Sequence, residues 1–444
     1  MKKLWLLAAA CSIALALQAC GGGGGDTTAS SGDASSPGAA QACSVADQRQ
    51  HVLDFMTNEY FWYQQIGTPD NNAATMDAYF QSLLYKPTDR FSFTEPTAAF
   101  QQLFDQGTFT GYGYSLAITD ATPTLRVRTI EPQGPAYLAG LRRGDTIISI
   151  DGFTPAQIAA GSAGSVSSDG IQRTFVVRDV AGNTKTLQAT SATFPLTPVQ
   201  SVTVLDATRN GQPVKVGYLD YTQFVTYSLP NLTSAVQAFV QQGASELVLD
   251  LRYNGGGDVA TSRDLASLIA GARVAGQTFV QLRYNDKNQA SNQTYAFNAP
   301  STSIPNLPRV FVIVTGSTAS ASELVINGLK PFMDVILIGS TTYGKPYGFG
   351  PYDYCGTTYN AVNFDAVNSA GVGGYTSGFA PTCPVADDLD HPLGDPNELD
   401  LKTALGYIST GTCAQAAQSA PLLASARRSS PVLGDVTPPG MFRR

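Results

Sequence analysis

Beyond residue 190, short apolar runs alternate with helix-like segments, and this alternation constrains the fold more than any other feature of the chain. The apolar runs predict strands at 216–221, 246–251, 310–315 and 335–338. Between them, helices are predicted at 229–242, after Asp258 and after Ser320. Such alternation is typical of an α/β layer on a largely parallel sheet. We therefore expect functional groups in the loops that follow its strands.

The N-terminal segment resembles the signal of a bacterial lipoprotein. Lys2 and Lys3 precede an apolar stretch at 4–17, which ends in Leu17-Gln18-Ala19-Cys20. Residues 4–19 are too few to cross a bilayer as a helix, which needs about 20 residues. We expect residues 1–19 to be a cleaved signal peptide and Cys20 to carry a lipid anchor to a membrane. By resemblance to Gram-negative lipoproteins, the glycine after Cys20 implies the outer membrane of a cell envelope, facing the periplasm or the cell surface.

Composition restricts the partners of the remaining chain. The formal net charge is −7, and about −9 without the two leader lysines, so we expect no nucleic-acid partner. Charged residues make up only 14% of the chain, which excludes a heptad coiled coil. Residues 20–42 are rich in Gly, Ser, Thr and Ala, and this composition predicts a flexible tether.

Four cysteines remain after the leader and the lipidated cysteine are set aside: Cys43, Cys355, Cys383 and Cys413. In an oxidising compartment they can form two disulfides, with three connectivities. We expect Cys355 to pair with Cys383, and Cys43 with Cys413. Four unpaired buried thiols are the alternative.

The two segments before residue 190 differ in periodicity. Apolar residues such as Val52, Phe55 and Met56 recur at spacings of three and four, which predicts a small helical region at 43–104. Short alternating runs at 125–130 and 146–150 predict a compact β-rich unit at 105–190.

The β-rich unit contains Gly111-Tyr112-Gly113-Tyr114, then Gly134-Pro135-Ala136 and an Ala-Gly-Leu-Arg-Arg-Gly-Asp run at 139–145. With these motifs it resembles a PDZ domain of the bacterial protease type. In such a domain, the backbone N–H groups of a glycine-rich turn receive a peptide's C-terminal carboxylate, and a strand edge pairs with its backbone. The resemblance implies a peptide-binding site at Gly111, Tyr112, Gly113 and Tyr114.

Three consecutive glycines, Gly255, Gly256 and Gly257, follow the strand expected at 246–251. Because glycine has no Cβ, their N–H groups can approach a ligand and stabilise a developing oxyanion by about 3 to 4 kcal/mol. A flexible strand-to-helix turn is the alternative. A dinucleotide site is excluded because the Gly-x-Gly-x-x-Gly spacing is absent.

A serine-rich run, Thr318-Ala319-Ser320-Ala321-Ser322-Glu323, lies between a predicted strand and a predicted helix. Ser320 with Glu323 three residues later is a capping-box pattern, in which the hydroxyl only caps the helix. A helix N-terminus also suits a nucleophilic serine, because its free N–H groups stabilise nearby negative charge.

Few residues of the mature chain could activate such a serine. Its histidines are His51 and His391, and His391 lies in an acidic loop where a solvated surface role is expected. Lys330 lies ten residues along the helix from Ser320, about 15 Å away by helical rise. Lys345 follows the next strand among aromatic and small residues, where desolvation would lower its pKa and make it a general base. An exposed loop lysine is the alternative.

These segments together resemble the C-terminal processing peptidases, also called tail-specific proteases, over residues 105–410. The resemblance rests on the Asp-Leu-Arg-x-Asn-x-Gly-Gly run, the Thr-Ala-Ser-Ala-Ser-Glu run and a Gly-Lys 25 residues after the first serine. It implies Ser320 as nucleophile, with Ser322 as second choice, and Lys345 as general base. The implied oxyanion donors are the N–H groups of Ala321 and of a glycine at 255–257, most simply Gly256. No metal or cofactor is implied, and the substrates would be proteins or peptides with exposed C-termini.

The resemblance also implies the domain organisation. The expected fold class is α/β (α+β multidomain): a small N-terminal helical region, a β-rich PDZ domain, and an α/β peptidase core of the ClpP/crotonase-like type at 191–413. We expect residues 414–444 to form a poorly ordered tail.

One residue departs from the family pattern. Members commonly have Gln four residues after the lysine, whereas this chain has Phe349, which cannot make that hydrogen bond. A catalytically inactive adaptor that binds protein tails through its PDZ domain is therefore the alternative function. A hydrolase using carboxylates at 387–400 is a third, supported only by the acidity of that stretch.

Overall fold

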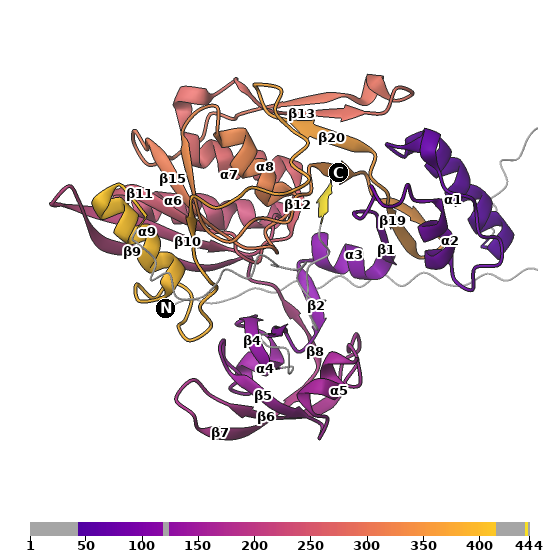
Figure 1. Cartoon of the computed structure of the whole chain (residues 1–444), viewed down its shortest axis with the longest axis horizontal. Helices are drawn as coiled ribbons and strands as arrows, with labels where there is room; N and C mark the ends of the chain where they lie inside the picture. Colours follow the sequence, from indigo (N-terminus) through magenta and orange to yellow (C-terminus); the bar gives the residue numbers. More distant parts are fainter. Residues whose placement is uncertain (1–42, 119–123, 414–439, 443–444) are drawn as a thin grey trace, which may run out of the picture. The chain divides into compact units, whose positions relative to one another are not determined.

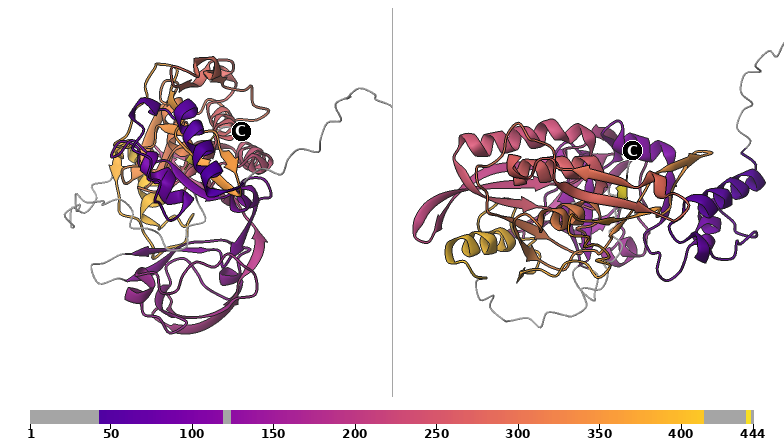
Figure 2. Two further views of the ribbon diagram at one scale, coloured as in Figure 1. Left: turned by 90° about the vertical axis from the view of Figure 1, so that its right-hand side faces the viewer. Right: turned by 90° about the horizontal axis from the view of Figure 1, so that it is seen from above.

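The computed structural model describes residues 43–118, 124–413 and 440–442, and its largest feature is the predicted α/β layer (Figure 1). A six-stranded sheet has the order β21-β16-β15-β11-β10-β9. Every neighbouring pair is parallel except β9 with β10, so the largely parallel sheet is confirmed. The strands are β9 (Val199–Arg209), β10 (Gln212–Tyr221), β11 (Ala244–Asp250), β15 (Arg309–Val314), β16 (Asp334–Gly339) and β21 (Cys383–Pro384). Figure 2 shows β9 and β10 as long, curved neighbouring strands.

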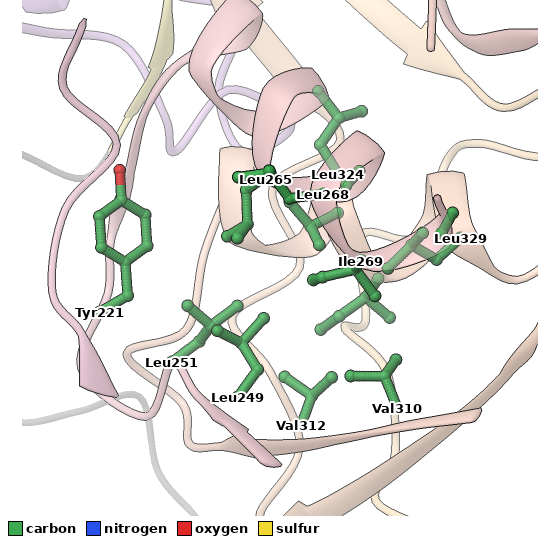
Figure 3. Packing of buried hydrophobic residues seen from close by; sticks show 14 of the residues in the cluster. Tyr221, Leu249, Leu251, Leu265, Leu268, Ile269, Val310, Val312, Leu324 and Leu329 are labelled. Carbon is green, nitrogen blue, oxygen red and sulfur yellow. The ribbon is translucent and has the colours of Figure 1, made fainter. Parts of the chain in front are cut away.

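Both faces of this sheet are apolar because helices cover both. The helices α6 (Leu229–Gln241), α7 (Val259–Ala270) and α8 (Ala321–Leu329) cover one face, and α9 (Leu399–Thr410) covers the other. Within β15, Val310 and Val312 pack toward α7 and α8 (Figure 3), whereas Phe311 packs toward α9. A strand that is buried on both faces has a continuous apolar sequence, and for this reason the strands of this sheet could be predicted from the sequence.

A second six-stranded sheet was not predicted. Its order is β12-β22-β17-β20-β13-β14. The strands are β12 (Gly256–Asp258), β13 (Thr278–Tyr284), β14 (Gln293–Ala296), β17 (Tyr347–Phe349), β20 (Phe364–Val367) and β22 (Gly440–Phe442). Within the tail expected at 414–444, the structure describes only β22, which pairs with strands on both sides.

The N-terminal region contains the expected helices and one unexpected strand. The helices are α1 (Val45–Glu59), α2 (Met76–Leu83) and α3 (Thr97–Phe104), and the strand is β1 (Phe93–Pro96). The side chains of Ser44 and Thr75 cap α1 and α2 by accepting from backbone N–H groups three residues later. A late hairpin, β18 (Tyr352–Tyr354) and β19 (Thr357–Asn360), joins β1 to form a sheet of order β1-β19-β18.

The β-rich unit is a five-stranded antiparallel sheet of order β3-β4-β5-β6-β7. Its elements are β3 (Tyr114–Ile118), β4 (Leu125–Ile130), α4 (Pro135–Leu138), β5 (Thr146–Ile150), α5 (Pro155–Ala159), β6 (Gln172–Arg178) and β7 (Thr184–Thr190). An antiparallel pair, β2 (Thr108–Gly111) with β8 (Ala192–Pro195), connects this unit to the rest of the chain. Short 3-10 helices complete the described secondary structure at Tyr63–Gln65, Thr226–Ser228, Ala272–Val274 and Gln289–Ser291.

The predicted disulfide connectivity is wrong. The structure pairs Cys43 with Cys355 and Cys383 with Cys413, with Cα–Cα distances of 5.7 and 5.5 Å. Cys355 lies in the turn of the β18–β19 hairpin, which pairs with the N-terminal region and so approaches Cys43. Cys383 lies in β21, next to β16, and meets Cys413 just after α9. Cys20 and the expected signal peptide and tether lie outside the described residues.

None of the helices within the described ranges is both long enough and apolar enough to span a membrane.

Candidate active site

Ser320 immediately precedes α8, on the turn that follows β15. Its φ of 59° and ψ of −114° fall in a region that residues other than glycine rarely occupy. Backbone strain of this kind is concentrated at functional sites, where the surrounding structure must enforce it. The side chain is fully buried, and its Oγ has no hydrogen-bond partner among the residues described. The Glu323 side chain accepts from the Ser320 N–H, as the capping-box pattern predicts, and the buried Ser320 hydroxyl lies at the N-terminus of α8.

The glycine-rich turn after β11 supports the serine turn. The carbonyl oxygen of Asn254 accepts from the N–H of Ala319 at 3.1 Å and from the Oγ of Ser322 at 2.9 Å. Because the Ser322 hydroxyl is engaged in this bond, Ser322 is a poorer nucleophile candidate than Ser320. At Gly257, with φ of 134°, a Cβ would collide with the carbonyl oxygen of Phe224, so this turn requires glycine.

The buried carboxylate of Glu323 joins the serine turn to the lysine loop. Its Oε2 accepts from the backbone N–H of Ser320 at 3.0 Å and of Lys345 at 2.8 Å. The two backbone nitrogens therefore cannot be farther apart than the sum of these distances. Its Oε1 accepts from the Thr342 hydroxyl at 2.6 Å and the Gly344 N–H at 2.7 Å. Burial raises the pKa of the Glu323 carboxyl, and these four donors oppose that rise.

Lys345 is buried, as its predicted role requires. Desolvation lowers the pKa of its amine to about 7, although the charges of Asp89 and Glu323 oppose this shift. The neighbouring Gly344, with φ of 82°, packs so closely on Thr376 and Gly378 that a Cβ would not fit. The loop thus holds the amine in an apolar setting where a large fraction is neutral near pH 7.

The N-terminal region supplies the surroundings of this amine, which sequence reasoning missed. Lys345 Nζ donates to the carbonyl oxygen of Phe91 at 3.3 Å and lies 5.7 and 4.8 Å from the ring centroids of Phe93 and Phe349. Phe349, which departs from the family pattern, therefore contributes an aromatic face in place of a hydrogen bond.

The loop that bears Phe91 is itself fixed. The buried Asp89 carboxylate accepts from the N–H groups of Phe91 and Ser92 and from the Tyr60 hydroxyl, at 2.9, 3.0 and 2.6 Å. Arg90 Nη2 donates to the carbonyl oxygens of Tyr343 and Gly344, at 3.1 and 3.2 Å. Hydrogen bonds from this loop thus reach both Lys345 and its neighbours.

The implied oxyanion donors differ in availability. Ala321 is the first residue of α8, so its N–H has no acceptor within the helix and can face a ligand. The Gly256 N–H instead donates to Asn254 Oδ1 at 2.9 Å. Gly256 could act as the second donor only by giving up that bond, so the choice among the three glycines stays a prediction.

A buried ion cluster anchors the glycine-rich turn to α9. The Arg252 guanidinium donates to Asp250, Glu398 and Asp400 at 2.8, 2.7 and 3.1 Å. Desolvation raises the pKa of Asp400 to about 8, and the charge of Arg252 opposes this. The acidic stretch therefore supplies a structural ion pair, and its carboxylates do not form a free catalytic pair.

The structure assigns the two histidines and Lys330 to other surroundings. His391 Nδ1 lies 2.7 Å from Asp388 Oδ2, and the His391 side chain is 41% exposed. The His51 ring packs on the Tyr354 ring at 4.3 Å between centroids. Lys330 Nζ lies over the Phe379 ring at 4.0 Å. The contacts described for His391, His51 and Lys330 are thus with residues other than Ser320.

The predicted peptide-binding residues lie together along one cavity of about 610 Å³. Gly111, Tyr112, Gly113 and Tyr114 line it and lead into β3, which is the edge strand of its sheet. Arg173, which sequence reasoning missed, lines the same cavity, and its guanidinium also forms an ion pair with Asp151 at 3.5 Å. Within the described part of the chain, no group of three or more His, Cys, Asp or Glu residues could hold a metal ion.

Comparison with known proteins matches three segments of the chain to known families. Residues 215–364 match peptidase family S41, residues 47–93 match the peptidase S41 N-terminal domain, and residues 126–158 match a PDZ domain. A C-terminal processing peptidase of Tetradesmus obliquus is 29% identical over 62% of this chain and 60% of its own length. A carboxyl-terminal-processing protease of Picosynechococcus is 30% identical over 54% of this chain and 55% of its own length. The chain thus spans little more than half of these relatives.

A solved structure overlaps a larger share of this chain than these two relatives do. A Bacteroides fragilis protein assigned to the S41 proteases is 27% identical, with a TM-score of 0.66, over 81% of this chain and 96% of its own. The matched segments include the Ser320 turn, the Lys345 loop and the N-terminal region that surrounds the lysine. The chain belongs to peptidase family S41 and carries a PDZ domain.

Proposed function

We propose that the chain is a serine endopeptidase that cleaves proteins near exposed C-termini, with Ser320 as nucleophile and Lys345 as general base. The observation that carries the proposal is the Glu323 carboxylate, which binds the backbone N–H groups of both residues. Two loops separated by α8 and β16 are thereby joined, one bearing a buried hydroxyl and the other a buried amine.

In the acylation step, neutral Lys345 Nζ accepts the proton of Ser320 Oγ as this oxygen attacks the carbonyl carbon of the substrate. The resulting oxyanion would receive hydrogen bonds from the Ala321 N–H and a glycine N–H of the turn at 255–257. The Lys345 ammonium then donates its proton to the departing amine, and an acyl-enzyme remains on Ser320.

In the deacylation step, Lys345 accepts a proton from a water molecule that attacks the ester. The bond between the acyl carbon and Ser320 Oγ breaks, the proton returns to Oγ, and a new C-terminal carboxylate leaves. Because Ser320 Oγ has no hydrogen-bond partner in this structure, the proposed bond to Nζ has to form when substrate binds.

The PDZ unit would select the substrate by its tail. An extended peptide can pair with the free edge of β3, while the backbone N–H groups at Gly111 to Tyr114 and the charge of Arg173 suit a terminal carboxylate. The protein substrates that we propose therefore carry a free and extended C-terminus.

We further propose that Cys20 is lipidated and holds the protein at the outer membrane, in the periplasm or on the cell surface. The support is the sequence Leu17-Gln18-Ala19-Cys20 after a short apolar stretch. Replacing Cys20 with Ser should move the protein from the membrane fraction to the soluble fraction.

Cleavage assays with the mature chain test the peptidase proposal. We expect a panel of peptides to be cleaved by the wild type and not measurably by Ser320→Ala or Lys345→Ala. Lys330→Ala is the matched control, since this lysine lies on the Phe379 ring and should leave cleavage unchanged. Equal activity in all four proteins would contradict the assigned pair, and no activity in any would favour the non-catalytic adaptor.

A further inference from the structure

The segment β22 lies between β12 and β17 in the second sheet. Figure 1 shows it as the yellow strand near the C mark, beside β12. It runs parallel to both neighbours, with Gly440 opposite Gly256 and Phe442 opposite Asp258 and Phe349. The chain's own C-terminal segment therefore completes a sheet whose other strands come from residues 256–367.

Without β22, the strands β12 and β17 would face each other across a gap one strand wide. Neighbouring strands lie about 4.8 Å apart, so the gap would measure about 9 to 10 Å. Its two walls would present the backbone groups that pair with β22 in this structure, and such groups are a template for an extended peptide. We call this space the strand slot, defined by β12 and β17.

The strand slot is bordered by both halves of the candidate active site. The strand β12 contains Gly256 and Gly257 of the implied oxyanion turn. The strand β17 begins at Tyr347, two residues after Lys345. A peptide strand in this slot therefore passes between the oxyanion turn and the loop that carries the proposed base.

Phe442 anchors the segment in an aromatic pocket. Its side chain is 1% exposed and packs in a cluster with Phe100, Leu103, Phe104, Val225 and Phe349. The ring centroids of Phe104 and Phe100 lie 4.5 and 5.6 Å away. Backbone pairing with a buried aromatic side chain at a fixed register is how a peptide is recognised by strand addition.

We infer that residues Gly440–Phe442 are a built-in competitor that occupies the strand slot and excludes substrate peptides from it. The inference rests on the proposed peptidase function. Because the segment is covalently joined to the chain, its effective concentration at the slot is independent of protein concentration. A substrate must displace it, so the intact chain is held in a state of low activity that release of the segment relieves.

A binding experiment tests the inference without requiring turnover. A fluorescent peptide with the sequence of residues 436–444 is titrated into two full-length proteins, Ser320→Ala and the double variant Ser320→Ala/Phe442→Ala. Loss of the buried ring weakens the resident segment, so we expect the peptide to bind the double variant roughly 10- to 100-fold more tightly. The same peptide with alanine in place of its phenylalanine is the matched control and should bind neither protein.

Hydrogen exchange of the same two proteins supplies a second readout. The amides at 256–258 and 347–349 should be protected in Ser320→Ala, exchange faster in the double variant, and regain protection when peptide is added. Equal peptide binding by both proteins, or binding by neither, would overturn the inference.

Cleavage assays separate this inference from the proposed function. With Ser320 intact, Phe442→Ala should raise kcat/KM for peptide substrates, and the added peptide should inhibit that variant competitively. Slot binding without any cleavage would refute the peptidase proposal alone. Cleavage that neither Phe442→Ala nor the peptide alters would refute the inference alone.

Discussion

The buried Lys345 amine gives the proposed mechanism a pH dependence whose size follows from the structure. A pKa of about 7 leaves about half of the amine neutral at pH 7, whereas the ordinary value of 10.5 would leave about 0.03%. Burial thus raises the population of the reactive form by more than about 1,000-fold. We expect kcat/KM to increase with pH and to level off above an apparent pKa near 7.

Phe93→Ser should change the pKa of Lys345, because Phe93 is part of the apolar surroundings of the amine. The Phe93 ring lies 5.7 Å from Lys345 Nζ and also lines the 610 Å³ cavity, so a smaller polar side chain should admit water to the amine. Hydration stabilises the ammonium and moves its pKa toward 10.5. If the pKa rose to about 9, the neutral fraction at pH 7 would fall to about 1% and kcat/KM by about 50-fold.

The assay measures kcat/KM from pH 6 to pH 10 for the wild type, Phe93→Ser and the matched control Phe93→Leu. We expect the Phe93→Ser defect to disappear as pH approaches 10, and Phe93→Leu to retain the wild-type profile because leucine keeps the site apolar. A loss of the same factor at every pH would refute the argument, since it would indicate structural damage. So would a wild-type profile that rises only near pH 10.

Two other substitutions test the supporting contacts. Glu323→Gln places an amide among four hydrogen-bond donors. We therefore expect steady-state kinetics to show kcat lowered by about 100-fold or more, with a smaller change in KM. An unchanged kcat would contradict the positioning role of Glu323. Arg252→Met leaves the carboxylates of Asp250, Glu398 and Asp400 buried without their partner, and thermal denaturation should show a loss of about 3 to 5 kcal/mol in stability. A melting temperature equal to that of the wild type would indicate that the cluster does not stabilise the chain.

The sequence was most informative where structure is local. Strands such as β4 (Leu125–Ile130) and β5 (Thr146–Ile150) have the predicted bounds, and α6 ends one residue before its predicted end. The main sheet was predictable because β10, β11, β15 and β16 are buried on both faces and read as apolar runs. The strands of the second sheet that border the candidate site have only three residues each, too few for a periodic pattern.

Most of the features that the sequence did not predict depend on contacts between distant segments. Phe91 and Lys345 are 254 residues apart, and nothing near either residue indicates that they touch. The partner of Cys43 depends on which later segment lies next to the N-terminal region. The β18–β19 hairpin pairs with β1, and this brings Cys355 to Cys43. Glu323 was the exception, because its place three residues after Ser320 could have identified it as a residue that positions the serine turn.

Labelling with a fluorophosphonate probe, followed by peptide mass spectrometry, would identify the nucleophile and its dependence on Lys345. We expect one phosphonylated residue, Ser320, at a rate that rises with pH through about 7 and is lost in Lys345→Ala. Modification of Ser322 instead of Ser320, or labelling that is unaffected by removal of the Lys345 amine, would contradict the assignment of a serine nucleophile activated by a buried lysine.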